Sequence, residues 1–336
     1  MTQIDPLARP AHDPTADAPP RGGLRAWIKL ARPHQWAKSA FVVVGPVFAY
    51  ADGNIRDSAL LWAAGAAAGA FSLASSASYI VNDVLDAPHD RMHPRKRRRP
   101  VASGAIAPGA ALAGAGVLAA LALVCLVFVP AAFRFWTGAA VVVYVANVMA
   151  YSLWLKHRVI ADVVCLSMGF VIRVLGGCAA VGISPTTWLL NVTFFIAMFL
   201  AFGKRLGERR SMGGEAAAAA RKVQAGYTDD MLRLAVVVTG VVALVAYAGY
   251  VLSQDAKYTF GFNLLWVTIL PATYGLLRAI VLLERGTYDD PTEMVIRDRG
   301  FLAAAGAFGA CVAALMAARH LGLIGVPPPE VLVPAI

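Results

Sequence analysis

The sequence predicts an all-α, polytopic membrane protein with nine transmembrane helices, and three observations lead to this fold class. Hydrophobic residues make up 59% of the 336-residue chain and charged residues only 15%, whereas soluble domains are about 45–50% apolar and about 25% charged. The mean hydropathy is +0.63. The apolar residues gather in runs that approach or exceed the roughly 20 residues needed to cross a bilayer. This composition excludes a disordered chain and a disulfide-stapled scaffold.

The nine spans follow one another along the chain as apolar runs between polar connections. The first run is short and contains Pro46, so it is the least typical. The runs lie at residues 38–53, 58–81, 109–129, 132–152, 159–182, 185–203, 231–253, 259–283 and 300–322. The flanking segments predict the domain limits: residues 1–22 a disordered cytoplasmic tail, residues 23–325 one transmembrane domain, and residues 326–336 a C-terminal tail.

The charge distribution predicts the orientation of these spans. The net charge is +10, from 30 Lys and Arg against 20 Asp and Glu. Of the basic residues, 25 fall on the side of the N-terminus and four on the opposite side. Because cytoplasmic loops of membrane proteins are enriched in Lys and Arg, we expect a protein of the inner membrane with a cytoplasmic N-terminus. Nine spans then place the C-terminus on the opposite side. The basic excess is explained by the membrane, and no nucleic-acid partner is expected.

An amide and three carboxylates follow the second span, where the chain leaves the membrane. On an ideal helix, Asn82, Asp83, Asp86 and Asp90 lie within about 100° of one another, and we call them the acidic stripe. Pro88 is expected to kink or end the helix before Asp90. Oxygen ligands suit Mg²⁺ combined with phosphate oxygens. The stripe therefore predicts a magnesium–phosphate site; the alternative is a solvated helix end with scattered acids.

Five consecutive cations, Arg95 to Arg99, come directly after the stripe. Such a run can anchor a cytoplasmic loop to anionic lipid. It can also bind phosphate groups, to which Arg offers a fork of two donors and Lys a point charge. Both interpretations remain open, and Lys96, Arg97 and Arg99 are the candidate phosphate ligands.

The pattern Asn82-Asp83-x-x-Asp86-x-x-x-Asp90, followed by Arg99-Pro100-x-x-x-Gly104, resembles the UbiA superfamily of intramembrane prenyltransferases. Segments between about residues 30 and 300 are similar to its decaprenyl-phosphate phosphoribosyltransferase branch. These segments are Arg32-Pro-His-Gln35-Trp36-Ala-Lys38, Tyr151-Ser152-x-x-Leu155-Lys156-His157, Gly169-Phe170-x-Ile172-Arg173, Gly203-Lys204-Arg205-x-x-Glu208, Tyr227-Thr228 and Arg297-Asp298-Arg299. The resemblance implies a helical bundle around a central cavity that opens to the cytoplasm.

The resemblance also implies the reaction. The 5-phosphoribosyl group of phosphoribosyl diphosphate would pass to a polyprenyl phosphate such as decaprenyl phosphate, with release of diphosphate, in the synthesis of cell-envelope arabinan precursors. Mg²⁺ is the implied cofactor, with Asn82, Asp86 and Asp90 as its ligands and the catalytic residues, and Asp83 as a substrate-binding residue. The acceptor phosphate is already ionised at neutral pH, so no general base is expected. The sequence leaves open whether the enzyme is a monomer or a homo-oligomer.

One departure from the superfamily pattern supports this branch. Typical members carry a second Asp-x-x-x-Asp motif after the sixth span, and here Lys204, Arg205 and Glu208 occupy that stretch. The change from acids to cations suits a donor that carries an additional phosphate group. We therefore expect these three residues to bind substrate.

Five further residues are predicted to contact substrate. Gln35 and Lys38, at the entrance to the first span, are candidates for the acceptor phosphate. Arg173 lies inside the fifth predicted span, and a charged side chain there is costly and usually functional. Tyr151 and Lys156, near the end of the fourth span, are expected to reach the same cavity.

Two other functions remain alternatives. The first is a prenyltransferase that joins a polyprenyl diphosphate to an aromatic acceptor and uses the same metal chemistry; the missing second acidic motif argues against it. The second is a transporter of anionic metabolites. Transporters often carry broken helices near the midplane of the membrane, whereas the polar residues here concentrate at one face.

Overall fold

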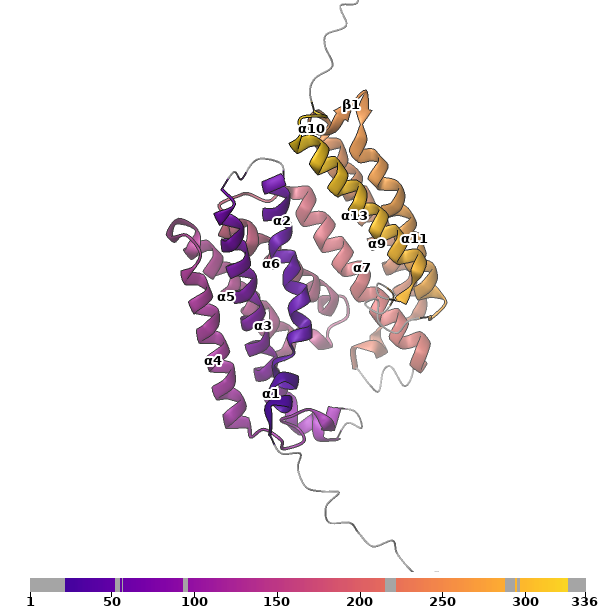
Figure 1. Cartoon of the computed structure of the whole chain (residues 1–336). Coiled ribbons are helices and arrows are strands. Elements are labelled where there is room, and N and C mark those ends of the chain that lie inside the picture. The colour runs from indigo at the N-terminus through magenta and orange to yellow at the C-terminus, as the bar shows by residue number, and fades with distance from the viewer. Residues whose placement is uncertain are drawn as a thin grey trace, which may run out of the picture. The chain divides into compact units, whose positions relative to one another are not determined.

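The computed structural model describes residues 22–51, 55, 57–92, 96–214, 222–287, 294 and 297–325, and these residues are almost entirely helical. The helices are α1 (Leu24–Ala31), α2 (Ala40–Ala51), α3 (Ala59–Met92), α4 (Pro108–Val127), α5 (Ala131–Leu153), α6 (Ala161–Ala180), α7 (Thr187–Met212), α9 (Asp229–Ser253), α10 (Asp255–Tyr258), α11 (Ile269–Glu284) and α13 (Arg299–His320) (Figure 1). Short 3₁₀ segments join them: η1 (Pro33–Ser39), η2 (Lys96–Arg98), η3 (Leu155–His157), η4 (Lys222–Gly226) and η5 (Leu264–Thr268). Strands β1 (Thr259–Phe260) and β2 (Phe262–Asn263) form a small antiparallel hairpin.

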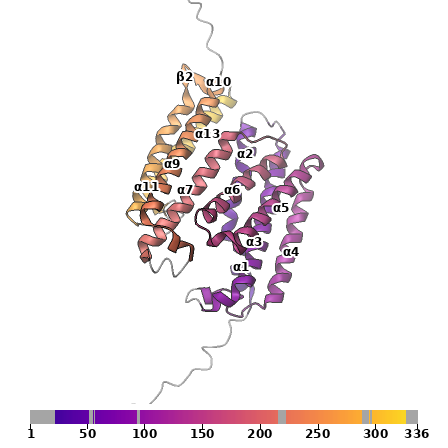
Figure 2. The ribbon, with the colours of Figure 1, turned by 180° about the vertical axis from the view of Figure 1, so that it is seen from behind.

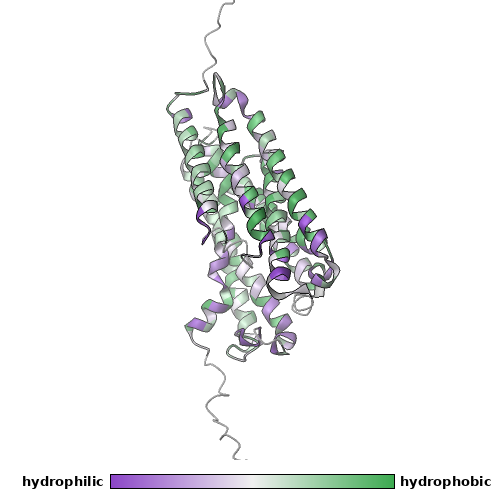
Figure 3. Ribbon diagram, turned by 90° about the vertical axis from the view of Figure 1, so that its right-hand side faces the viewer, coloured by the Kyte–Doolittle hydropathy of each residue, from purple (hydrophilic) through white to green (hydrophobic). Residues whose placement is uncertain are grey.

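Eight helices of the described residues are long and apolar enough to cross a membrane, and they correspond to the second to ninth predicted spans. Hydrophobic residues colour long stretches of helix green, and hydrophilic residues gather toward helix ends and connections (Figure 3). The first predicted span is α2, a helix of 12 residues with Pro46 inside it. The all-α, multi-pass fold is confirmed, with eight helices of spanning length where nine were predicted.

The described chain divides into two compact units, and α3 contributes to both. The first unit holds α1, residues 76–92 of α3, η2 and residues 108–119 of α4. Its hydrophobic core includes Leu30, Ile80 and Val101, all buried. Burial of this apolar surface joins α1 to the second half of α3. The predicted domain limits stay a prediction, since residues 1–21 and 326–336 lie outside the described part.

The second unit contains α2, the first half of α3, the rest of α4, and all helices from α5 onward. Within it, α5 packs on α6, α6 on α7 and α7 on α9, while α11 contacts both α9 and α13 (Figures 1 and 2). Helix α2 approaches α6 so closely that a Cβ atom at Gly177 would lie 1.6 Å from the backbone oxygen of Val42. Small residues allow this contact between helices in lipid.

Local capping explains where several helices begin. The side chains of Thr186 and Thr228 accept hydrogen bonds from backbone N–H groups in the first turns of α7 and α9, and Asp298 does so for α13. Each cap satisfies a donor that the helix itself cannot pair. Helix α3 does not end at Pro88: it continues through this residue to Met92 and keeps Asp90 on the helix. A proline costs one backbone hydrogen bond, and α3 tolerates that loss.

Candidate functional site

The acidic stripe forms one side of a polar cluster in the first unit. Its four residues all lie on α3. Asp83 and Asp90 are buried, whereas Asn82 and Asp86 are partly exposed. The Asn82 amide donates to Asp86 Oδ2 at 3.1 Å, as expected for residues one turn apart on the same face. The predicted placement of an amide and carboxylates along one helix face is therefore present.

Two arginines from other segments of the same unit pair with the buried carboxylates. Arg32, which ends α1 in the left-handed conformation (φ 52°), lies with Nη2 2.6 Å from Asp83 Oδ1. Arg99 Nη1 lies 3.2 Å from Asp83 Oδ1 and 2.7 Å from Asp90 Oδ2. Charge-assisted bonds of this length offset the cost of burying the carboxylates. Arg32 was not singled out from the sequence as a charge partner; the available signal was its place at the start of one of the segments on which the family resemblance rests.

The remaining cations of the basic loop are placed differently from Arg99. Arg95 lies outside the described residues. Lys96 is partly exposed and Arg97 exposed on η2, and the backbone carbonyl of Arg98 accepts a hydrogen bond from Lys29 Nζ at 2.9 Å. Arg99, one of the predicted phosphate ligands in this loop, pairs with Asp83 and Asp90 of the stripe. Lys96 and Arg97 leave part of their surface accessible.

The residues of the stripe fit a Mg²⁺ ion that is completed by phosphate oxygens. In the part of the chain that the structure describes, no group of three or more His, Cys, Asp and Glu side chains is arranged to hold a metal ion by itself. Mg²⁺ usually takes only one or two carboxylates and obtains its other ligands from water and substrate phosphates. The bonded pair Asn82 and Asp86 supplies an amide oxygen and a carboxylate on adjacent turns. This donor set matches the chemistry of the ion.

A separate polar cluster lies in the second unit, where α6, α7 and η4 meet. Asp162, Arg205 and Tyr227 are all buried. Arg205 Nε and Nη2 both donate to Asp162 Oδ2 at 3.1 Å, and Tyr227 Oη donates to Asp162 Oδ1 at 2.7 Å. Sequence reasoning proposed Arg205 as a phosphate ligand, but its guanidinium is enclosed in this ion pair. Burial, together with the hydrogen bond to Asp162, raises the pKa of the Tyr227 phenol above its ordinary value, so the phenol stays protonated and can donate.

The neighbours of Arg205 on α7 are more accessible. Lys204 and Glu208, one turn apart, are both partly exposed. Glu208 Oε2 accepts a hydrogen bond from Gln224 Nε2 at 2.9 Å and lies 3.9 Å from Arg205 Nη1. Gln224 is itself buried and also donates to the backbone oxygen of Arg205 at 3.2 Å. Neither Gln224 nor Tyr227 carried a charge pattern that could have marked it from the sequence.

The intramembrane cation Arg173, which the sequence predicts to contact substrate, is buried in α6. Its Nη2 donates to Tyr144 Oη at 2.7 Å and its Nη1 to the backbone oxygen of Gly169 at 3.2 Å. No carboxylate pairs with Arg173 among the residues that the structure describes. An aromatic face and a phenol contact this cation in place of a carboxylate.

The other predicted contact residues lie in short segments of the second unit. Gln35 and Lys38, on η1, are partly exposed, and the next residue, Ser39, is buried and accepts a hydrogen bond from Ser72 Oγ at 2.8 Å. Tyr151 near the end of α5 and Lys156 on η3 are also partly exposed. All of them keep some accessible surface.

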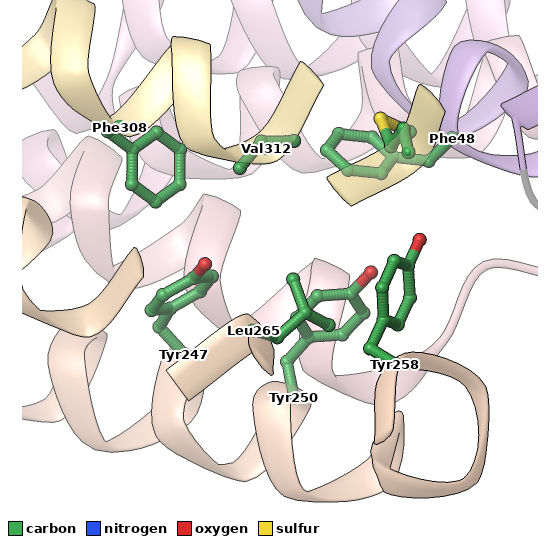
Figure 4. A pocket seen from close by; sticks show the side chains of 8 residues that line it. Phe48, Tyr247, Tyr250, Tyr258, Leu265, Phe308 and Val312 are labelled. Carbon is green, nitrogen blue, oxygen red and sulfur yellow. The ribbon is translucent and has the colours of Figure 1, made fainter. Parts of the chain in front are cut away.

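An aromatic cavity lies elsewhere in the second unit and contains none of the predicted site residues. Figure 4 shows Tyr247, Tyr250 and Tyr258 on one side of it, facing Phe308 and other apolar side chains from α13 and α2. Tyr247 and Thr268 share a hydrogen bond of 2.5 Å. The lining carries no charged residue, so this cavity does not suit a phosphate group.

Comparison with known proteins connects these features to a family. Residues 39–304 match the UbiA prenyltransferase family. The decaprenyl-phosphate phosphoribosyltransferase of Mycolicibacterium smegmatis is 33% identical over 314 residues, which cover 89% of this chain and 96% of that protein. The enzyme of the same name from Mycobacterium tuberculosis is 32% identical over 286 residues, covering 84% and 91%.

Solved structures show the same fold at lower sequence identity. A UbiA homologue from Archaeoglobus fulgidus, determined bound to DMAPP and Mg²⁺, superposes with a TM-score of 0.62 at 17% identity and covers 90% of this chain and all of its own. The helical multi-pass architecture and the family match agree over most of the sequence. This chain belongs to the UbiA prenyltransferase family.

Proposed function

We propose that this protein transfers the 5-phosphoribosyl group of phosphoribosyl diphosphate to the phosphate of a polyprenyl phosphate, releasing diphosphate. The observation that carries the proposal is the match, over 84–89% of this chain, to enzymes named decaprenyl-phosphate phosphoribosyltransferase. Decaprenyl phosphate is accordingly the proposed acceptor, and the product a precursor of cell-envelope arabinan. Lys204 and Glu208 in place of a second Asp-x-x-x-Asp motif support the same donor.

The reaction requires one bond to form and one to break at the anomeric carbon of ribose. An oxygen of the acceptor phosphate forms the new bond to C1, and the bond from C1 to the diphosphate oxygen breaks. Positive charge develops on the ribose and negative charge on the leaving group. The enzyme therefore gains most by stabilising the departing diphosphate electrostatically. No proton has to be removed from the acceptor, because a phosphate monoester is already ionised.

The acidic stripe is proposed to hold the metal ion and with it the diphosphate. Asn82, Asp86 and Asp90 would be the protein ligands, and the bound Mg²⁺ would neutralise charge on the leaving group. Asp83 is proposed to act through its buried pairs with Arg32 and Arg99, which orient that end of the cluster.

The accessible cations are proposed to bind the phosphate groups directly. Lys96 and Arg97 on η2 belong to the first unit, and Lys204 and Lys156 to the second. Each keeps exposed surface, which a phosphate ligand needs. Gln35 and Lys38 on η1 are the proposed contacts for the acceptor phosphate. Tyr151, in the last turn of α5, is a further proposed contact.

Transfer of radiolabel from phosphoribosyl diphosphate into lipid tests the proposal. The purified full chain, in detergent with decaprenyl phosphate and Mg²⁺, should form a lipid-extractable phosphoribosyl product that is absent without acceptor and suppressed by EDTA. A parallel reaction with geranyl diphosphate and an aromatic acceptor tests the alternative prenyltransferase activity. A prenylated product with no lipid-linked ribose would replace the proposal with the alternative.

The orientation is also proposed: the N-terminus and the acidic stripe face the cytoplasm. Its support is the placement of 25 of the 30 basic residues on one side of the predicted spans. The acceptor phosphate would then lie on the cytoplasmic side of the membrane, where the soluble donor phosphoribosyl diphosphate is present.

A further inference from the structure

We propose that Tyr227 and Arg205 are positioning residues, which fix two substrate-binding segments by hydrogen-bonding to the carboxylate of Asp162. One segment is η3, which carries Lys156, and the other is the face of α7 that carries Lys204 and Glu208. The inference rests on the proposed function and deepens it. It assigns Arg205 a different task from the phosphate ligand expected from the sequence. The argument begins with the backbone just before α6.

The chain enters α6 through a strained turn centred on Ile160. This residue has φ 67° and ψ −48°, and the Ala161 N–H bonds the Val159 carbonyl at 2.8 Å. These features define a classic γ-turn, which is rare. A β-branched side chain is especially unfavourable at positive φ. Strained residues persist only where their surroundings hold them, and they gather at functional sites.

Tyr227 holds this turn from the opposite segment. The backbone N–H of Ile160 donates to Tyr227 Oη at 2.7 Å, and the same oxygen donates its proton to Asp162 Oδ1 at 2.7 Å. One phenol thus connects the strained residue to the first turn of α6. The ring also packs edge-on against Phe202 of α7, with centroids 6.3 Å apart, so its place does not depend on the hydroxyl alone.

Arg205 fixes α7 to the same carboxylate. Its side chain is 2% exposed, and two of its nitrogens share Asp162 Oδ2. A paired contact of this kind restricts the rotation of α7 about its own axis. Lys204 and Glu208 share one face of α7, because residues 204 and 208 are one turn apart. This face lies next to the one that carries Arg205. The buried pair of Arg205 and Asp162 therefore sets the rotational position of α7 and with it the direction in which Lys204 and Glu208 point.

The same carboxylate also controls the position of Lys156. Lys156 lies on η3, four residues before Ile160, and η3 contacts α5, α6 and η4. Val159, which follows η3 and begins the γ-turn, fits closely against η4, since a Cβ atom at Gly226 would lie 2.5 Å from Val159 Cγ2. Loss of the Tyr227 hydroxyl would release the γ-turn and loosen η3, whereas the packed core beneath would remain.

Diphosphate affinity tests the inference without relying on turnover. The full chain is purified in detergent as wild type, Tyr227→Phe, Arg205→Lys and a control, Tyr258→Phe, which alters another fully buried tyrosine in a different hydrophobic cluster. The Kd for inorganic diphosphate in the presence of Mg²⁺ is measured by calorimetry. We expect it to rise about 10- to 100-fold in Tyr227→Phe, the range produced by small displacements of binding groups. Arg205→Lys keeps the charge but loses the paired contact, and we expect a rise in the same direction; the control should match wild type.

Kinetics separate positioning from a merely structural role. KM for phosphoribosyl diphosphate should follow the Kd while kcat changes by less than about threefold. An unchanged Kd and KM, or a loss of kcat that only follows the fraction of folded protein, overturns the inference. If Tyr227→Phe does not fold, Arg205→Lys alone decides. If wild type transfers no phosphoribosyl group, the proposed function fails, but the ratio of diphosphate affinities still decides this inference.

Discussion

Arg173 and Tyr144 are bound to each other in the interior of the second unit. The guanidinium carbon of Arg173 lies 4.4 Å from the Tyr144 ring centroid, and its Nη2 donates to Tyr144 Oη at 2.7 Å. The phenol in turn donates to Ser75 Oγ at 3.1 Å. Arg173 Nε is buried and has no partner among the described residues. A single tyrosine thus supplies both a hydrogen-bond acceptor and an aromatic face to an intramembrane cation.

A double-mutant cycle on this pair should show strong coupling. Tyr144→Phe and Arg173→Met each remove one side of the hydrogen bond between the two residues, whereas the double variant removes both. We expect a coupling of about 0.5–2 kcal/mol in the free energy of unfolding, measured by denaturation in mixed micelles. Additive effects would show that Arg173 obtains its stabilisation elsewhere.

Asp86→Ala should abolish phosphoribosyl transfer and leave the fold intact. The carboxylate is partly exposed and accepts a hydrogen bond from the Asn82 amide one turn away on the same helix, so its proposed role in holding Mg²⁺ outweighs its contribution to stability. We expect turnover to fall more than about 100-fold, with an unchanged unfolding midpoint. Asp230→Ala, at a carboxylate whose side chain is 93% exposed, is the control and should keep full activity. Wild-type turnover by Asp86→Ala would remove the proposed metal ligand.

Asp90→Ala should lose both activity and stability. Asp90 is buried and lies 2.7 Å from Arg99 Nη1. Its removal leaves Arg99 with Asp83 alone, and breaking a buried pair costs up to about 3–5 kcal/mol. Thermal unfolding beside Asp86→Ala measures the difference. Equal midpoints for the two variants would mean that the pair with Arg99 contributes nothing to the fold.

Asp298 should give the protein an acid-sensitive component of stability. Hydrogen bonds from Arg278, with that of the Phe301 N–H at the start of α13, hold the pKa of Asp298 below its ordinary value. A carboxyl with a lowered folded pKa stabilises the fold above its unfolded pKa of about 3.9, and this contribution is lost as pH falls through the folded value. Below about pH 4, the unfolding midpoint of Asp298→Asn should therefore fall less steeply with decreasing pH than that of Asp230→Asn. Parallel curves for both variants would contradict the assignment.

Cysteine labelling can test the proposed orientation at two positions, one at the start of α9 and one beyond its end. Asp230 lies in the first turn of α9, and Phe260, 70% exposed, lies in the hairpin that follows α10. In a variant whose four native cysteines are changed to Ala, we expect an impermeant maleimide added to spheroplasts to label Phe260→Cys and not Asp230→Cys. Labelling of position 230 alone would reverse the orientation.

Composition and local periodicity determined the fold class and the content of the acidic stripe. In lipid, each backbone polar group must be paired within its own helix, so apolar runs marked eight helices before any packing was considered. The same local geometry brought Asn82 and Asp86 together, since residues four apart share a helix face. The exception was the first span, where α2 has only 12 residues around Pro46.

Only the tertiary structure decided which charges meet. Arg32 pairs with Asp83 across 51 positions and Arg205 with Asp162 across 43. Of the five consecutive cations that stand closer to the stripe in sequence, Arg99 pairs with Asp83 and Asp90. Partner choice depends on how separate helices pack and on which side chains that packing removes from water. A buried carboxylate needs a partner whose geometry is correct, and that geometry is a property of the folded chain, which no pattern of neighbouring residues contains.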